Sequence, residues 1–245
     1  MSRPDSLATR AVATADAFGR DVSHNRGYLY TTNARLSSRL ANRRLTDAAL
    51  EAVALRGRTL LDVGCGDGTY TNDLYDLGGP SSVYAFDPVA EAIAVARERQ
   101  GERHITFAEH AADRIPVPDD RFDVAHLRGV LHHMERPIEA LREAFRVARV
   151  LVVIEPNGYN PVLKVIEKTS RYHREHGERS FAPSTLRRWI AGLGGRTRSL
   201  TYAGLVPFFC PDVLAVGLKR VEPLFERVTP LNQLSCAVSV LVAER

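Results

Sequence analysis

Short apolar runs alternate with amphipathic stretches through the middle of this 245-residue chain. Between the runs, apolar residues recur every three to four positions, which predicts helices. Each run is bounded by turn-forming residues, as is typical of buried β-strands. The five runs are 59–63, 82–87, 104–110, 122–128 and 150–154. Strands that alternate with helices in this way predict an α/β fold with a doubly wound, parallel sheet.

The pattern differs on both sides of this region. Before it, helical spacing over 6–18 and 34–55 surrounds a predicted loop at 27–33. We interpret residues 1–55 as an N-terminal helical cap or lid, and residues 56–245 as the main domain.

After the fifth strand, two helices are expected, followed by two more strand-like stretches. The helices cover 161–176 and 184–190, the second with Ser184 as its N-cap, and the strands cover 197–202 and 235–243. Between these strands lies an apolar, aromatic insertion at about 204–231, which we expect to contribute to a substrate pocket.

The first strand breaks into a glycine-rich turn that opens a helix. Gly64, Gly66 and Gly68 let the backbone turn sharply and let a ligand approach closely. A dinucleotide fingerprint has its glycines spaced G-x-G-x-x-G. Here Gly68 comes one residue early, and Asp62 ends the strand beside the turn. A carboxylate at this place disfavours a pyrophosphate and favours a cationic ligand.

The second strand also closes on an acid, Asp87, which lies 23 residues beyond Gly64. In doubly wound folds an acid at this place accepts hydrogen bonds from the ribose hydroxyls. The alternative is an N-cap for the helix that Pro88 is expected to start. NAD enzymes use the same acid, so Asp87 indicates a ribose without choosing the cofactor.

The sequence LLDVGCGDGTYT at 60–71 resembles the first motif of the class I S-adenosylmethionine-dependent methyltransferases. The resemblance implies a Rossmann-like, seven-stranded sheet, mostly parallel with one antiparallel edge strand. It also implies S-adenosylmethionine as cofactor, a ligand with a sulfonium and an ammonium and no phosphate. The residues expected to bind it in this part of the chain are Asp62, Gly64, Cys65, Gly66, Gly68, Asp87 and Pro88.

A second stretch, around Ile115-Pro116-Val117 and Phe122-Asp123-Val124, resembles one found in small-molecule methyltransferases. There, an acid just after the third strand often receives the adenine amino group. The family pattern places that acid at Ala111, whereas this chain has Asp113. Either Asp113 reaches the adenine or backbone groups near Ala112 read it.

The turn after the fourth strand, 129–134, is typical of the ubiquinone and menaquinone methyltransferase-like group. The resemblance implies that Leu127 and Arg128 lie beside the methionine part of the cofactor. It also implies that His132 or His133 faces the transfer site. Methyl transfer depends mainly on alignment, and a base helps for hydroxyl, amide-like nitrogen or acidic carbon acceptors. His133 is the first candidate and His132 the second; the alternative is a helix-capping or packing histidine.

Substrate contacts are expected from the lid, from the region after the fifth strand and from the insertion. Packing of the cap is the alternative for the two lid tyrosines. The chain lacks the N/D-P-P-Y/F motif typical of methyltransferases acting on nucleobase amino groups. A small aromatic or heterocyclic acceptor, in natural-product or quinone-like chemistry, is therefore favoured, with O, N or C as the methylated atom. The candidates are Tyr28, Tyr30, Tyr172, His173, Arg179, Phe208 and Phe209.

Composition narrows the classes of partner. The net charge is +4, but the basic residues are spread along the chain, and the arginines at 35, 39, 43 and 44 have the spacing of a solvated helix face. No apolar run reaches the ~18 residues needed to span a bilayer, and the N-terminus lacks a signal-peptide core. We expect a cytoplasmic monomer or homodimer without nucleic-acid or membrane partners.

Metal binding is not expected. His173 and His176 are three residues apart, but no third ligand is evident near them, and the three cysteines are scattered. Two rivals to the methyltransferase remain: an NAD(P)-dependent oxidoreductase on the same kind of sheet, and a non-catalytic, cofactor-binding regulator.

Overall fold

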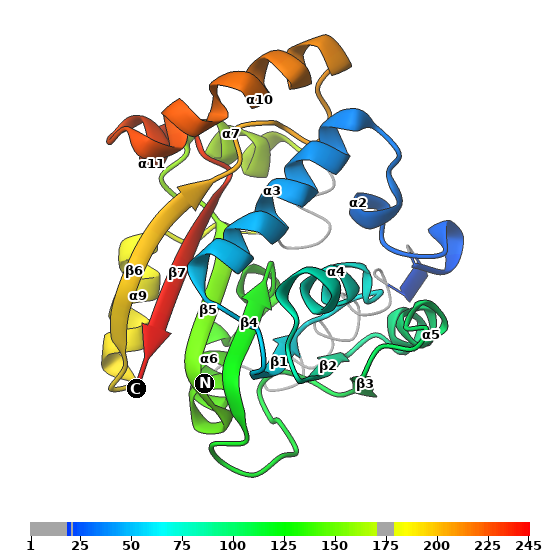
Figure 1. Cartoon of the computed structure of the whole chain (residues 1–245). Helices are drawn as coiled ribbons and strands as arrows, with labels where there is room; N and C mark the ends of the chain where they lie inside the picture. The colour runs from blue at the N-terminus through cyan, green and yellow to red at the C-terminus, as the bar shows by residue number, and fades with distance from the viewer. Residues whose placement is uncertain (1–18, 21, 171–178) are drawn as a thin grey trace, which may run out of the picture.

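The computed structural model describes residues 19, 20, 22–170 and 179–245, which form a single seven-stranded sheet with helices packed around it (Figure 1). Its strands are β1 (Thr59–Val63), β2 (Ser82–Asp87), β3 (Ile105–Glu109), β4 (Phe122–Arg128), β5 (Ala148–Pro156), β6 (Arg196–Ala203) and β7 (Val238–Glu244). Their order is β3-β2-β1-β4-β5-β7-β6. Strands β1 to β5 pair in parallel, and β7 runs antiparallel between β5 and β6. The predicted doubly wound α/β sheet is therefore confirmed.

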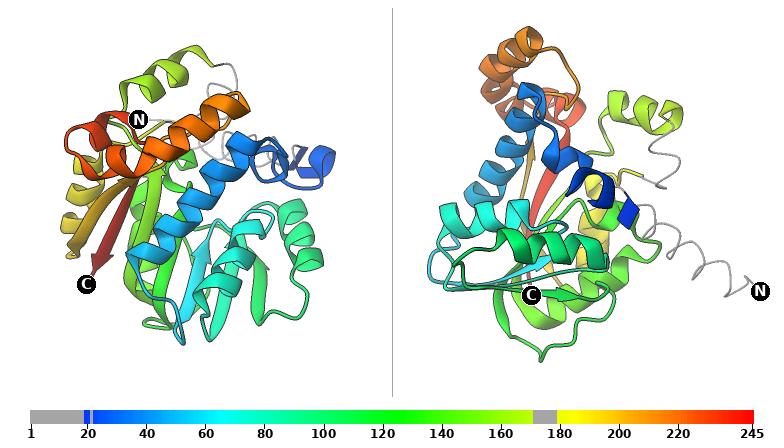
Figure 2. Two further views of the ribbon diagram at one scale, coloured as in Figure 1. Left: turned by 45° about the horizontal axis from the view of Figure 1, so that its top comes forward. Right: turned by 90° about the vertical axis from the view of Figure 1, so that its right-hand side faces the viewer.

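The helices cover both faces of this sheet and its carboxyl edge. They are α2 (Leu29–Thr32), α3 (Leu36–Ala52), α4 (Thr69–Gly78), α5 (Ala90–Arg99), the 3-10 turn η1 (Leu131–His133), α6 (Pro137–Val147), α7 (Pro161–Thr169), α9 (Pro183–Gly192), α10 (Asp212–Arg227) and α11 (Leu231–Ser235). Helices α3, α4 and α5 pack on one face, and α6 and α9 on the other. Figures 1 and 2 show α10 and α11 lying across the end of the sheet at which β6 finishes.

The two cores explain why the central strands are continuous apolar runs. Leu60 and Leu61 of β1 are both fully buried, but Leu60 packs with α3 and α4 and Leu61 packs with α6. Each central strand thus buries both of its faces, as parallel strands between two helical layers do. The strand predictions over 59–63, 82–87 and 122–128 match the observed bounds.

Several local predictions are wrong. The expected loop at 27–33 contains the helical turn α2. The helix expected to start at Pro88 begins at Ala90, after Val89 as N-cap. The N-cap of α9 is Ala182 rather than Ser184, because Pro183 takes the first helical position, where its fixed φ fits.

The C-terminal third departs further from the prediction. Helix α7 ends at Thr169, before the predicted end near residue 176, and 171–178 lie outside the described residues. Residues 231–235 form α11, so the last strand starts at Val238. The insertion at 204–231 contains the 16-residue helix α10, which the sequence pattern does not predict.

Candidate active site

The glycine turn after β1 has a closely packed backbone in the left-handed region. Gly64, Gly66 and Gly68 have φ values of +69°, +56° and +74°, a region that side chains with a Cβ rarely adopt. A Cβ on Gly64 would lie 2.6 Å from Val130 Cγ2, so the loop after β4 rests directly on this turn. The turn is fixed to β2 as well, since the amides of Gly64 and Cys65 donate to the Phe86 carbonyl at 2.8 and 2.9 Å.

Asp87 lies at the carboxyl end of β2 against the same turn. Its two carboxylate oxygens accept hydrogen bonds from the Gly66 amide and the Val89 amide, both at 3.0 Å. Burial raises the pKa of the Asp87 carboxyl to about 6. The backbone bonds set the direction of the carboxylate and leave each oxygen a free lone pair.

Asp62 is turned into the domain. One of its oxygens lies 2.8 Å from His126 Nδ1, and the other accepts a hydrogen bond from Thr71 Oγ1 at 2.6 Å. The buried carboxylate thereby joins β1 to β4 and α4. A ligand at the turn would feel its charge, but both oxygens are already engaged inside the protein.

The segment around α2 closes over the turn. The Tyr28 ring covers Gly66, where a Cβ would lie 2.7 Å from a ring carbon, and it stacks on Tyr30. Asp67 holds this segment: one of its oxygens accepts from the Tyr28 amide at 3.1 Å and from Thr31 Oγ1 at 2.5 Å. This role of Asp67 was not predicted, although the residue lies inside the sequence motif at 60–71.

Arg128 ends β4 beside α3. Its guanidinium stacks on the Tyr70 ring at 3.7 Å and donates to Thr46 Oγ1 and Asn42 Oδ1 of α3, both at 3.1 Å. Within the described part of the chain, no carboxylate forms an ion pair with it, and burial lowers its pKa. A half-buried guanidinium without a counter-ion can bind an anionic group.

A second unpredicted feature is a buried acid–imidazole pair. Glu155, at the end of β5, is fully buried and lies 2.8 Å from His132 Nδ1. Its other oxygen accepts hydrogen bonds from the amides of Val130 and Leu131 at 2.9 and 2.7 Å. An acid closing a buried apolar strand was the available signal. Glu155 fixes both the η1 backbone and the His132 ring.

Comparisons with known proteins agree with this geometry. A family model described as "Methyltransferase domain" matches residues 61–151, from β1 into β5. The chain is 25% identical over 195 residues to the ubiquinone/menaquinone biosynthesis C-methyltransferase UbiE of Ectopseudomonas mendocina, covering 75% of this chain and 71% of that protein. Residues 61–151 therefore form a methyltransferase domain, and the similarities indicate an S-adenosylmethionine-dependent methyltransferase.

Other similarities are more local or more remote. The chloroplastic 2-methyl-6-phytyl-1,4-hydroquinone methyltransferase 2 of Oryza sativa subsp. japonica is 32% identical over 108 residues, but the match spans only 31% of that protein and 43% of this chain. A solved methyltransferase from Thermotoga maritima superposes with a TM-score of 0.66 at 17% identity, covering 94% of this chain and 99% of that one. One from Aquifex aeolicus gives 0.58 at 18% identity, covering 86% and 94%. These structures establish the fold alone.

The residues of this methyltransferase fit the cofactor of its family. Asp87 offers acceptors for the ribose hydroxyls, and Arg128 is an unmatched cation for the carboxylate of the methionine part. A side chain at Gly64 or Gly66 would collide with Val130 or Tyr28, so the turn needs glycine at both positions for these residues to pack against it.

The remaining predicted cofactor residues are placed as follows. Cys65 and Ala112 are buried, and Pro88 and Asp113 are exposed at the turns after β2 and β3. Leu127 points into the core, so only its backbone can face a ligand. The adenine contact stays a prediction for Ala112 and Asp113.

The predicted substrate residues are scattered. Arg179 donates to the Met134 carbonyl at 3.0 Å, which brings it to the η1 turn. Phe208 lies over the start of α3, and Phe209 is 64% exposed. Tyr172 and His173 lie outside the described residues.

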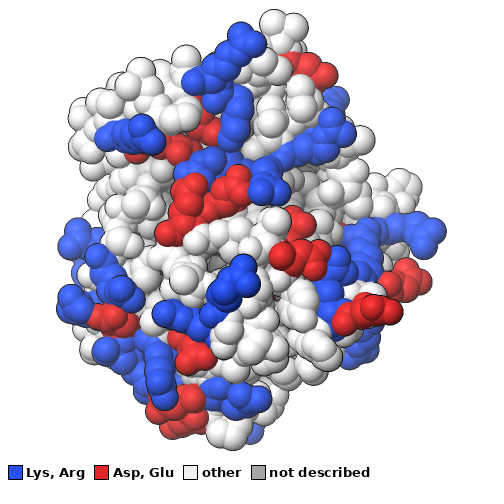
Figure 3. All heavy atoms as spheres, in the orientation of Figure 1, with Lys and Arg blue, Asp and Glu red and all other residues white. Residues whose placement is uncertain are grey.

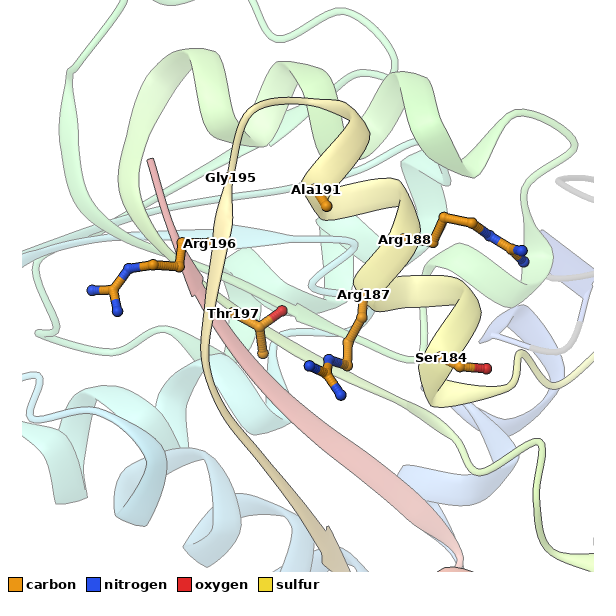
Figure 4. Close-up of a pocket in the computed structure, with 7 residues that line it drawn as sticks. All are labelled: Ser184, Arg187, Arg188, Ala191, Gly195, Arg196 and Thr197. Carbon is orange, nitrogen blue, oxygen red and sulfur yellow. The ribbon is translucent and has the colours of Figure 1, made fainter.

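Other surface features are separate from this site. A hollow between α9 and β6 contains none of the predicted site residues and lies at the opposite edge of the sheet, where β6 begins (Figure 4).

Basic and acidic side chains are intermixed on the face shown in Figure 3. In the predicted arginine face of α3, Arg43 pairs with Asp47, and Arg44 is mostly buried against Glu226. The described residues contain no helix able to cross a membrane and no metal-binding group of three His, Cys, Asp or Glu side chains.

Proposed function

We propose that this methyltransferase transfers the methyl group of S-adenosylmethionine to a small aromatic acceptor of the hydroquinone type, with His132 as general base. The pair of His132 and Glu155 carries the proposal. The two relatives named above act, by their names, on a hydroquinone and in quinone biosynthesis, which supports an acceptor of this kind.

The cofactor supplies an electrophilic methyl group with its leaving group already attached. The protein must therefore align the acceptor with the methyl group and exclude water from the site. Asp87 would accept hydrogen bonds from the ribose, and Arg128 would bind the carboxylate. The stacked rings of Tyr28 and Tyr30 would keep water from the turn.

A phenolic oxygen, or the ring carbon beside it, becomes a good methyl acceptor when a proton leaves. Glu155 accepts at His132 Nδ1, which favours the tautomer with its proton on that nitrogen and leaves Nε2 as the base. The same carboxylate stabilises the imidazolium once the proton has moved. This orientation favours His132 over His133, which the sequence analysis ranked first.

The test is transfer of a labelled methyl group to a panel of hydroquinones, phenols and heterocycles. We expect His132→Asn to lower kcat by about 10²–10⁴-fold, the range typical of a lost general base. Glu155→Gln should lower kcat less and shift the lower limb of its pH profile. Exposed His104 provides the matched control, since His104→Asn should behave as wild type.

Two results would contradict the assignment: an unchanged kcat in His132→Asn, or a pH profile that Glu155→Gln leaves in place. Calorimetric binding of S-adenosylhomocysteine to each variant separates lost catalysis from a damaged site.

A further inference from the structure

Helix α10 differs from an ordinary surface helix in its side chains, because two of its acids face inward and several apolar residues face outward. Its inner face buries Ala215 and the side chain of Glu222, which accepts from the Leu205 amide at 2.9 Å. The next acid on that face, Glu226, accepts from Arg44 and from the Gly204 amide. The acids of this helix are therefore used inside the protein, apart from Asp212 at its first residue.

The outward face of α10 is apolar and cationic. Val213, Val221 and Leu224 have the spacing of one helical face; Val213 is 88% exposed and Leu224 is 61% exposed. Arg220 and Arg227 share this face and are exposed. Leu231 and Leu234 continue the exposed apolar surface onto α11, which contacts α10. We call this surface the α10–α11 face.

The α10–α11 face lies at the same edge of the sheet as the cofactor turn. Helix α3 links the two: Ser37 and Ser38 donate to the Phe208 carbonyl just before α10, at 2.9 and 3.0 Å. About one and two turns further along α3, Asn42 and Thr46 accept hydrogen bonds from Arg128. Figure 1 shows α3 running from the α10 end of the molecule towards the sheet.

We propose that the α10–α11 face binds the surface of a lipid bilayer that carries anionic lipids. A contiguous exposed apolar surface marks an interaction site, and arginines beside it suit an interfacial helix. The charge argues against a second copy of the chain: a two-fold contact through this face would bring Arg220 and Arg227 of both copies together. The expectation of no membrane partner changes accordingly, and binding at the surface needs no spanning helix.

This proposal depends on the proposed function only for the reason why the protein would bind a bilayer. A hydroquinone with an apolar tail would reside in the bilayer, and a protein lying on that bilayer by its carboxyl edge could take it up there. Vesicle binding itself requires neither the acceptor nor catalysis.

The test is sedimentation of the full chain with vesicles of phosphatidylcholine containing about one-third phosphatidylglycerol, compared with phosphatidylcholine alone. We expect wild type to sediment with the anionic vesicles. The double variant Val213→Ser, Leu224→Ser should partition roughly tenfold or more weakly. Arg220→Glu, Arg227→Glu should lose the preference for anionic vesicles. Leu77→Ser on α4, an exposed leucine outside the α10–α11 face, is the control and should bind as wild type.

Unchanged unfolding temperature and S-adenosylhomocysteine binding would show that the variants are folded. The proposal is overturned if wild type stays in the supernatant, or if the double variant sediments as wild type does. It is also overturned if sedimentation velocity shows a dimer that Val213→Ser, Leu224→Ser dissociates while vesicles bind nothing. Methyl transfer to a water-soluble acceptor without vesicle binding would sink this inference alone; vesicle binding without any transfer would sink the proposed function alone.

Discussion

Asp87 and Arg128 mark the two ends of the cofactor site with opposite charges. Each is held by its own neighbours: Asp87 by two backbone amides, and Arg128 by the Tyr70 ring and two side chains of α3. Such preset groups bind with less loss of side-chain freedom.

The first prediction concerns pH. Because burial raises the pKa of Asp87 to about 6, the carboxylate that accepts from a ribose is present above that pH. The affinity for S-adenosylhomocysteine, measured by calorimetry, should fall about tenfold between pH 7.5 and 5. In Asp87→Asn it should be weak and nearly independent of pH. Asp212→Asn, at the exposed start of α10, should keep the wild-type profile.

The same shift has a consequence for stability. The folded-state pKa lies above the ordinary value of 3.8, so the folded protein binds this proton more tightly than the unfolded chain. The contribution of Asp87 to the free energy of unfolding should therefore decline as pH rises from about 4 to about 6 and stay low above it. Denaturant unfolding at several pH values, wild type against Asp87→Asn, measures the difference. An opposite slope would show that the carboxyl is not held neutral by burial.

Arg128 gives the next prediction. Arg128→Met keeps an apolar stem on Tyr70 and removes the charge, so S-adenosylhomocysteine should bind roughly ten- to a hundredfold more weakly, as expected for one charge-assisted contact. Arg121, exposed beside Phe122, provides the matched change Arg121→Met with no effect on binding. Equal affinities for the two variants would place the carboxylate of the cofactor elsewhere.

At the level of elements, the buried strands were predictable and the outer helices were not. A strand buried on both faces has to be a short apolar run, whatever packs on it, as 59–63 and 150–154 show. Helix α10 escaped prediction because several of its apolar residues face outward, whereas Glu222 and Glu226 face inward. The pattern of apolar positions therefore did not mark a helix packed on a core.

The residues of the site also divide into those that the local sequence predicts and those that it does not. Asp87 and the glycines follow from strand ends and turn geometry, which are local. Glu155 is 23 residues from His132 in the sequence, and Arg128 meets Tyr70 and α3 only after the sheet has formed. Contacts between residues so far apart in the sequence cannot be predicted from the spacing of residues along it.

The junction between β5 and α7 gives a prediction about an element. The Gly158 amide donates to the Phe181 carbonyl at 3.0 Å, and a Cβ on Gly158 would lie 2.4 Å from the Phe181 carbonyl carbon. Gly158→Ala should lower the free energy of unfolding by about 1–3 kcal/mol, because backbone has to move. Gly192→Ala, at the end of α9 with open space around it, should be neutral or raise that free energy by up to ~1 kcal/mol. Guanidinium unfolding of the two variants compares them, and equal effects would contradict the assigned clash.

In the whole molecule, the residues proposed to bind the cofactor and to act in methyl transfer lie at the carboxyl edge of the sheet. The glycine turn, Asp87, Arg128 and the pair of His132 and Glu155 each follow or end one of four parallel strands, and the α10–α11 face lies along the same edge. The hollow between α9 and β6 lies at the amino edge of the sheet.

One calorimetric titration decides whether the glycine turn and Asp87 bind the nucleoside of S-adenosylmethionine or that of NAD⁺. S-adenosylhomocysteine and NAD⁺ are each titrated into the full chain and into Asp87→Ala. We expect S-adenosylhomocysteine to bind to wild type, its binding to be lost in Asp87→Ala, and NAD⁺ to give no heat. Binding of NAD⁺ alone, or S-adenosylhomocysteine binding that Asp87→Ala leaves unchanged, would contradict this expectation.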